Sequence, residues 1–200
     1  MIHPDTELRF INDTIGYGVV ATKFIPRGTI TWVQDDLDKV YTHDDISRLN
    51  PIVLEHLEKY SFTNSKGQKV LCWDNARFVN HSFRASCMST AYDFEIAIRD
   101  IHPGEQLTDD YGYLNVEEPF EAEDEGTDRK VVYPDDILRY YKEWDAAIEA
   151  NFATIGVVSQ PLQAYVSAAN WQAFIQAMRG EAPLRSIKTC YFEHKVVNRD

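Results

Sequence analysis

Two short polar segments of the sequence contain the side chains best suited to bind or orient a reacting group. The first is the run NHS at residues 80–82, which follows a phenylalanine and a valine. The second contains Tyr111, which follows two aspartates and precedes a glycine. A single histidine is more often structural than functional, and an Asn-His-Ser run also occurs in turns. Neither segment alone therefore identifies a reaction.

Two closely spaced glycines begin the stretch GYGVVATKFIPRGT, residues 16–29, and point to another kind of site. Gly16 and Gly18 have the spacing of a dinucleotide-binding loop, and Asp35 and Asp36 lie near the distance of the acidic residue that such sites use. In that motif the glycines open a helix whose N-terminus holds the pyrophosphate. Here β-branched residues and a PRG turn follow instead, which favours strands on both sides. A nicotinamide-dependent enzyme stays only as a weak alternative, to be tested by nucleotide binding.

The composition restricts the class of protein and of partner. The chain has 200 residues, of which 44% are hydrophobic, and this suits one folded domain with an appendage. Its formal net charge is −12, which argues against binding to nucleic-acid phosphates. The same charge is compatible with a basic protein or peptide substrate, and also with solubility alone.

Cysteine usage and the first residues predict an intracellular, cytoplasmic location. Cys72, Cys87 and Cys190 are odd in number and widely spaced, which suggests neither a disulfide framework nor a C-x-x-C zinc site. The first residues lack the basic and apolar regions of a signal peptide. No apolar segment approaches the ~20 residues that a membrane span needs, so we expect no association with membranes.

The elements that must position these residues begin with strands. Residues 7–42 alternate short β-rich runs with turns. Residues 43–60 are rich in helix formers, and we expect Pro51 to divide them into two short helices, with itself in the first turn of the second. Residues 92–100 alternate in hydrophobicity, with Glu95 on the side opposite the large apolar residues, as is typical of a strand.

The last third of the chain changes from acidic to helical. Residues 117–128 contain seven acids and read as an exposed linker or flexible loop. Two apolar stripes at helical spacing follow, and they predict a helix pair that packs on the β-rich part. The stripes consist of Ile137, Leu138, Tyr141, Trp144 and Ile148, and of Trp171, Phe174, Ile175 and Met178.

Taken in chain order, the motifs GxG, RFxNHS and GEQLTxDYG resemble the SET domain of protein-lysine methyltransferases, over roughly residues 7–115. The DDYG ending is similar to that of small bacterial SET proteins. The resemblance implies a mainly β fold with some α-helix, in which small curved sheets surround a knot-like threading of the RFxNHS segment. We expect a SET domain at 1–116, an acidic linker at 117–133 and a C-terminal helical extension at 134–200.

The resemblance also implies a site. Its cofactor would be S-adenosylmethionine, with S-adenosylhomocysteine as product, and its substrate a lysine side chain of a protein. Tyr111 would lie beside the reacting atoms, and Tyr60 is a weaker candidate for the same lysine channel. The amine must arrive in line and neutral, although free lysine has a pKa of about 10.4. The first two motifs would hold the cofactor through Gly16, Tyr17, Gly18, Arg77, Phe78, Asn80 and His81.

The sequence departs from the family in two places. Phe83 stands where many SET enzymes have a zinc-binding cysteine, and Ala122, Asp124 and Asp128 stand where three more are expected. Because structural zinc needs four ligands, we expect no metal. Asp109 occupies a position that is often Phe or Tyr in related enzymes and that influences how many methyl groups are added, so the degree of methylation stays open.

These departures leave one further alternative, a catalytically inactive SET-like module that binds cofactor or peptide. The missing zinc ligands and Asp109 favour it, whereas the intact Tyr111 and the Asn80-His81 pair argue against it. If the chain is an enzyme, its C-terminal helices would close the lysine channel with aromatic side chains such as Tyr140, Tyr141 or Trp144. The oligomeric state stays open.

Overall fold

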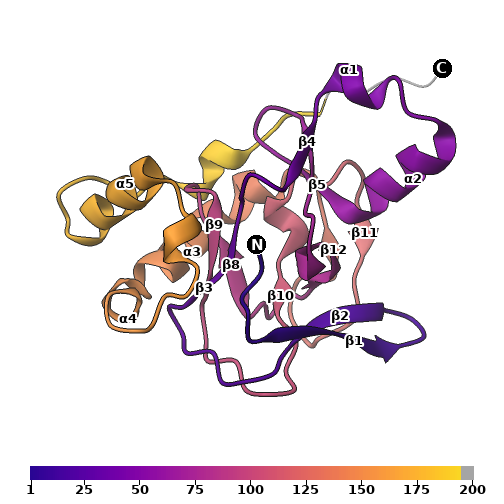
Figure 1. The fold of residues 1–200 in the computed structure, drawn as a ribbon. Coiled ribbons are helices and arrows are strands. Elements are labelled where there is room, and N and C mark those ends of the chain that lie inside the picture. Colours follow the sequence, from indigo (N-terminus) through magenta and orange to yellow (C-terminus); the bar gives the residue numbers. More distant parts are fainter. Residues whose placement is uncertain (195–200) are drawn as a thin grey trace.

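Short strands in small sheets form the first half of this computed structural model, which describes residues 1–194 (Figure 1). The first sheet is an antiparallel hairpin of β1 (Thr6–Asn12) and β2 (Gly16–Ala21). Asn12 closes its turn, since the side-chain oxygen accepts the N–H groups of Thr14 and Ile15 at 2.9 and 2.8 Å. Both glycines lie within β2 and not between strands, but they open no helix, as the sequence predicts.

A three-stranded antiparallel sheet lies at the centre and has the order β3 (Ile30–Val33), β9 (Phe94–Ala97), β8 (Cys87–Ser89). Alternating sequences are typical of half-buried strands, but all four residues of β9 are buried. Glu95 is therefore inside the protein, on the middle strand, where it is paired with Trp32 on one side and Ser89 on the other.

A second three-stranded sheet has the order β4 (Lys39–Tyr41), β6 (Lys69–Leu71), β5 (Ser61–Thr63). Between β4 and β5 the chain forms two helices, α1 (His43–Ile46) and α2 (Pro51–Tyr60). They lie at the end of the molecule opposite the C-terminal helices (Figure 1).

The division between α1 and α2 confirms the expected role of Pro51. Proline occupies the first turn of α2, where a helix needs no N–H donor. The side chain of Asn50 caps the same turn by accepting the N–H of Val53 at 3.0 Å.

The two polar motifs meet in the parallel pair of β7 (Asn80–His81) and β10 (Thr108–Asp109). Each strand adjoins a 3-10 helix, Asn75–Phe78 before β7 and Tyr111–Tyr113 after β10. The knot-like threading that the resemblance implies stays a prediction.

The segment at 117–133, expected as an exposed linker, carries a short hairpin of β11 (Phe120–Glu121) and β12 (Val131–Val132). The helices α3 (Asp136–Glu149), α4 (Phe152–Ile155) and α5 (Ala168–Met178) follow. Shorter 3-10 turns cover Gln163–Tyr165 and Ile187–Cys190. The proposed boundaries at 116 and 133 stay a prediction, and residues 195–200 of the extension lie outside the described residues.

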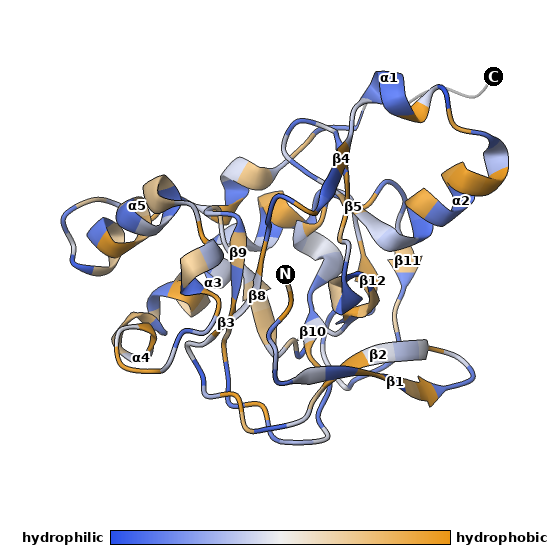
Figure 2. Ribbon diagram, viewed as in Figure 1, coloured by the Kyte–Doolittle hydropathy of each residue, from blue (hydrophilic) through white to orange (hydrophobic). Residues whose placement is uncertain are grey.

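The C-terminal helices share one hydrophobic core with the central sheet, as the apolar stripes predict. Ile137, Trp144 and Ile148 of α3 join Phe174 of α5 in this cluster. Two stripe residues do not join this cluster, namely Leu138, which is 39% exposed, and Ile175. Hydrophobic and hydrophilic residues alternate along α3 and α5, as expected for helices with one buried face (Figure 2).

We predict that Phe174→Ala lowers the free energy of unfolding by about 3–5 kcal/mol, the usual result of emptying a buried aromatic site. Phe174 is fully buried and packs edge-on against Tyr92 and Phe94 of the sheet region, with ring centroids 5.2 and 5.0 Å away. Urea denaturation measures the change, with Val157→Ala as control because Val157 is 80% exposed. Equal stability of the two variants would mean that the extension does not support the sheet.

Candidate active site

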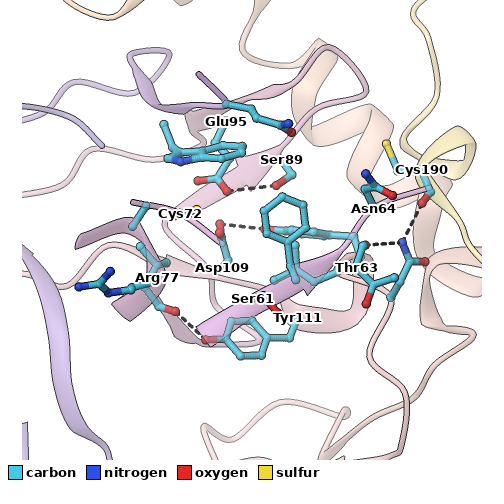
Figure 3. Close-up of a pocket in the computed structure, with 18 of the residues that line it drawn as sticks. Ser61, Thr63, Asn64, Cys72, Arg77, Ser89, Glu95, Asp109, Tyr111 and Cys190 are labelled. Carbon is cyan, nitrogen blue, oxygen red and sulfur yellow. Dashed lines mark hydrogen bonds between the residues drawn. The ribbon is translucent and has the colours of Figure 1, made fainter. Parts of the chain in front are cut away.

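A cavity of about 590 Å³ lies beside the two polar motifs, and Figure 3 shows residues that line it. Three of the predicted site residues line it, namely Tyr60, Arg77 and Tyr111. Tyr60 packs edge-on against Phe78, with ring centroids 5.4 Å apart, and the Arg77 guanidinium lies 5.2 Å from the centre of the same ring. The sequence therefore brings both candidate catalytic tyrosines to one cavity.

Tyr111 is fixed at two points by the NHS segment and the residue before it. Its hydroxyl donates a hydrogen bond to the Val79 carbonyl oxygen at 2.6 Å, and its backbone N–H donates to His81 Nδ1 at 3.1 Å. Asp110 caps the 3-10 turn by accepting the Gly112 N–H at 3.0 Å. Burial raises the pKa of the Tyr111 phenol, so the hydroxyl keeps its proton at neutral pH.

His81 lies among aromatic rings and is neutral at neutral pH. Its ring packs edge-on against Phe83 at 4.5 Å and Phe120 at 5.5 Å, and burial lowers its pKa. Since Nδ1 accepts the Tyr111 N–H, the ring proton is on Nε2. Nε2 is buried and has no hydrogen-bond partner among the described residues. Such a donor can be satisfied by a ligand, and this fits the adenosyl cofactor that the motif implies.

Gly18 leaves room for the side chain of Asn80. A Cβ at residue 18 would lie 2.7 Å from Asn80 Nδ2 and would also collide with Gln106 Oε1. Asn80 Nδ2 uses this space to donate to the Tyr17 carbonyl oxygen at 3.1 Å and to Gln106 Oε1 at 3.0 Å. The glycine thus brings the β1–β2 hairpin against β7. Sequence reasoning did not single out Gln106, although this residue belongs to the GEQLTxDYG motif.

The rest of the predicted cofactor set is near these groups but does not line the cavity. Gly16 has a φ of +81°, and no atom lies within 4 Å of the place where a Cβ would stand, so its conformation is what favours glycine there. Tyr17 is half exposed and packs edge-on against Phe10 at 5.7 Å. Phe78, Asn80 and His81 also lie outside the cavity lining and connect to it through Val79 and Tyr111.

A buried pair of carboxyl groups, Glu95 and Asp109, lines the same cavity. Asp109 accepts a hydrogen bond from the Tyr113 hydroxyl at 2.9 Å, and Glu95 accepts one from the Ser89 hydroxyl at 3.2 Å. Burial raises the pKa of both groups, and the neighbouring Asp109 charge raises that of Glu95 further. Sequence reasoning singled out Asp109 but not Glu95, for which the only signal was an acid inside a strand rich in apolar residues.

Arg129 connects the acidic segment to the segment that contains Tyr111. Its guanidinium forms ion pairs with Asp110 and with Asp136, the latter at 2.6 Å, and lies 4.6 Å from the centre of the Phe83 ring. Phe83, which stands where the family has a zinc-binding cysteine, is therefore part of an arginine–aromatic cluster. The pairing of Arg129 was not visible in the sequence, because its partners belong to other segments.

The acidic segment also contacts the NHS motif directly. Glu125 accepts a hydrogen bond from the Ser82 hydroxyl at 2.7 Å, and the Phe120 ring lies 6.2 Å from that of Tyr111. Part of this largely exposed segment therefore lies against the candidate site.

The expected closure of the channel by helix aromatics is wrong in its residues. Tyr140 packs on Arg129 at 4.4 Å and Trp144 packs edge-on against Tyr113 at 5.2 Å, and neither lines the cavity. The extension reaches the cavity through Ile187 and Cys190 of its last 3-10 turn instead.

Two searches of the described residues bear on metals and membranes. Across residues 1–194, no three His, Cys, Asp or Glu side chains are grouped to hold a metal ion. The expected absence of zinc stays a prediction. Among the helices that the structure describes, none combines the length and apolar character of a membrane-spanning segment.

A comparison with solved structures finds that this chain is similar to chains from Polycomb Repressive Complex 2. Apo ctPRC2 with two substitutions in Ezh2 is 24% identical, with a TM-score of 0.43. A humanised mutant of the Chaetomium thermophilum complex, bound to the inhibitor GSK126, is 23% identical with a TM-score of 0.38. An autoinhibited ctPRC2 bound to S-adenosylmethionine is 24% identical with a TM-score of 0.42. Each match covers 55% of this chain and only 15% of the other chain.

A comparison with curated protein sequences finds no match. The family model of the SET domain matches residues 16–112, a range that begins at Gly16 and ends directly after Tyr111 and thus spans all three motifs. The small antiparallel sheets and the C-terminal helices agree with that fold. Residues 16–112 of the chain form a SET domain.

Proposed function

We propose that this chain transfers a methyl group from S-adenosylmethionine to the side-chain amine of a lysine in a protein substrate. The observation that carries the proposal is the position of Tyr111, which is held by both polar motifs in the wall of a cavity of about 590 Å³. SET domains are typical of S-adenosylmethionine-dependent lysine methyltransferases, and residues 16–112 belong to this family.

The residues that would hold the cofactor are those of the first two motifs. His81 offers an unpartnered Nε2–H, counted over residues 1–194, and Gly18 lets the hairpin approach Asn80. Phe120 and Phe83 provide apolar surface on either side of the His81 ring. When bound, S-adenosylmethionine supplies a methyl group on a positively charged sulfur, which is a good leaving group.

Tyr111 is suited to orient the amine. Its hydroxyl proton is donated to Val79, so the lone pairs of its oxygen are free to accept an N–H from the amine. This would turn the nitrogen lone pair in a fixed direction, which is the main requirement for an in-line transfer. Because burial raises the pKa of the phenol, the oxygen stays neutral and does not hold the amine as a tightly paired ammonium.

The substrate class that we propose is a basic protein or peptide. Glu58 and Glu118 line the cavity and are exposed, so they add negative charge at its edge. Negative charge at the edge of a cavity increases the rate at which a positively charged, lysine-rich segment encounters it. Cys72, Cys87 and Cys190 are free thiols, which fits the proposed intracellular location.

We predict that Tyr111→Phe slows methyl transfer by about 10²- to 10³-fold, the usual loss when one orienting or stabilising group is removed. Binding of S-adenosylmethionine should be unchanged. The assay follows labelled methyl groups from S-adenosylmethionine into lysine residues of proteins in a cell extract, identified by mass spectrometry. Tyr165→Phe is the control, because Tyr165 is half exposed and lies outside the cavity lining. Cofactor binding by the wild type without any transfer would favour the inactive SET-like module.

We predict that Gly18→Ala weakens the binding of S-adenosylmethionine by about tenfold, equivalent to one well-formed hydrogen bond, because the new Cβ displaces Asn80. Calorimetry with S-adenosylmethionine and S-adenosylhomocysteine measures the change, and NAD should not bind. Gly156→Ala is the matched control, since no atom lies within 4 Å of its Cβ position. Unaltered affinity in Gly18→Ala, or binding of NAD, would contradict the assignment of the cofactor site.

A further inference from the structure

Glu95 and Asp109 turn their carboxyl groups toward one another in the wall of the cavity (Figure 3). They come from β9 and β10, and only 8% and 4% of each residue is exposed. Both act on the phenol of Tyr111. Burial is the main cause that raises the pKa of this phenol, and the charges of the two carboxyl groups raise it further. The pair therefore belongs to the same site as the candidate catalytic tyrosine, although the mechanism above does not use it.

Two neighbouring carboxyl groups inside a protein resist carrying two negative charges, since burial and mutual repulsion oppose the second ionisation. The hydrogen bonds from Tyr113 and Ser89 stabilise the one charge that remains. Other titratable groups that act on the pair or feel its charge are Asp110, Tyr111, the N-terminal amine and the Cys72 and Cys87 thiols.

Two other residues of the lining carry buried polar atoms without a partner. Trp32 and Thr63 line the cavity and are 7% and 4% exposed. Trp32 Nε1 and Thr63 Oγ1 have no hydrogen-bond partner within the described part of the chain. Buried polar groups are nearly always hydrogen-bonded, so these two atoms are exceptions beside the carboxyl pair.

We propose that Glu95 and Asp109 together accept a proton from the ammonium group of the incoming substrate side chain. This inference rests on the proposed function, because it assigns the proton acceptor for the same lysine. An alkylammonium carries a positive charge, which is opposite to the single negative charge of the pair. The ammonium must lose one proton before its nitrogen can attack.

The step balances within the cavity. One N–H bond of the ammonium breaks, and one O–H bond forms on the carboxylate of the pair. The products are a neutral amine, whose lone pair is free, and a carboxyl pair that carries two protons and no charge. The methylated ammonium that forms later can lose its next proton in the same way, once the pair has returned its proton to solvent.

The first test asks whether the pair is protonated, and uses the pH dependence of stability. Burial raises the pKa of Glu95 well above its usual 4.5. A carboxyl group whose pKa is raised in the folded state makes its full contribution to stability below pH 4.5. This contribution is lost as the pH rises toward the folded-state pKa. We predict that above pH 4.5 the unfolding equilibrium constant of the wild type rises relative to that of Glu95→Gln, by up to about tenfold per pH unit. Parallel curves in urea denaturation would overturn the proton-sharing pair.

The second test uses n-butylammonium as a probe of the side chain. We expect calorimetry, with S-adenosylhomocysteine present, to show binding to the wild type with the same enthalpy in buffers of different ionisation enthalpy, because the proton stays in the protein. Asp109→Asn should bind the probe about ten- to a hundredfold more weakly, as expected for the loss of a charged hydrogen-bond partner, and should release one proton to the buffer. Glu95→Gln is a second variant, which removes the other carboxyl group of the pair. Glu55→Gln, on the exposed face of α2, is the matched control and should behave as the wild type.

The protonation of the bound probe decides the role of the pair. NMR of n-butylamine labelled with ¹³C next to nitrogen should show a neutral amine when bound to the wild type at neutral pH. A bound ammonium, no binding at all, or equal binding by the wild type and both carboxyl variants would overturn the proposal. Binding of the probe as a neutral amine by a chain that transfers no methyl groups would instead support the acceptor site and contradict only the proposed function.

Discussion

The parallel pairing of β7 with β10 is the constraint on which the candidate site depends. It places residues 80–81 beside residues 108–109, and the Ser82 N–H extends it by donating to the Asp109 carbonyl oxygen at 2.9 Å. The chain must then turn at Tyr111, which can reach both His81 and the Val79 carbonyl oxygen only from that position. Without this short pair, the two polar motifs would be unrelated loops. The same pairing sets the cavity wall, because Asp109 is one of its strand residues.

Arg129 holds the C-terminal part of the chain against this junction. Its two ion pairs join Asp110, next to Tyr111, to Asp136 at the start of α3, and all three residues are largely removed from water. Buried charges are stable only while they are paired, so each partner depends on the others. The rings of Phe83 and Tyr140 cover the guanidinium. An arginine cluster thus connects the segment next to Tyr111 with the start of α3.

Local patterns were enough to predict much of the fold. Pro51 and the β-branched residues after Gly18 act through backbone preferences that are visible in a few residues, and the structure agrees with both. The burial of Glu95 could not be predicted in this way, because its alternating strand is covered on both faces by segments far away in the sequence. The same reason hid the contacts of Phe120, Arg129 and Gln106. The motifs identified which residues matter, but the contacts across the fold determine their surroundings.

The electrostatic requirements of Tyr111 and of the carboxyl pair are linked. A negative charge held near Tyr111 raises the pKa of its phenol and so keeps the hydroxyl neutral. The same charge would attract a cation into the cavity, whose wall also carries rings such as Trp32 and Phe62. If the cation gives its proton to the pair, the charge on both sides disappears together, and no isolated charge stays buried at the moment of attack. On this proposal, the carboxyl group of Asp109 takes part in handling the substrate proton, and Glu95 completes the pair.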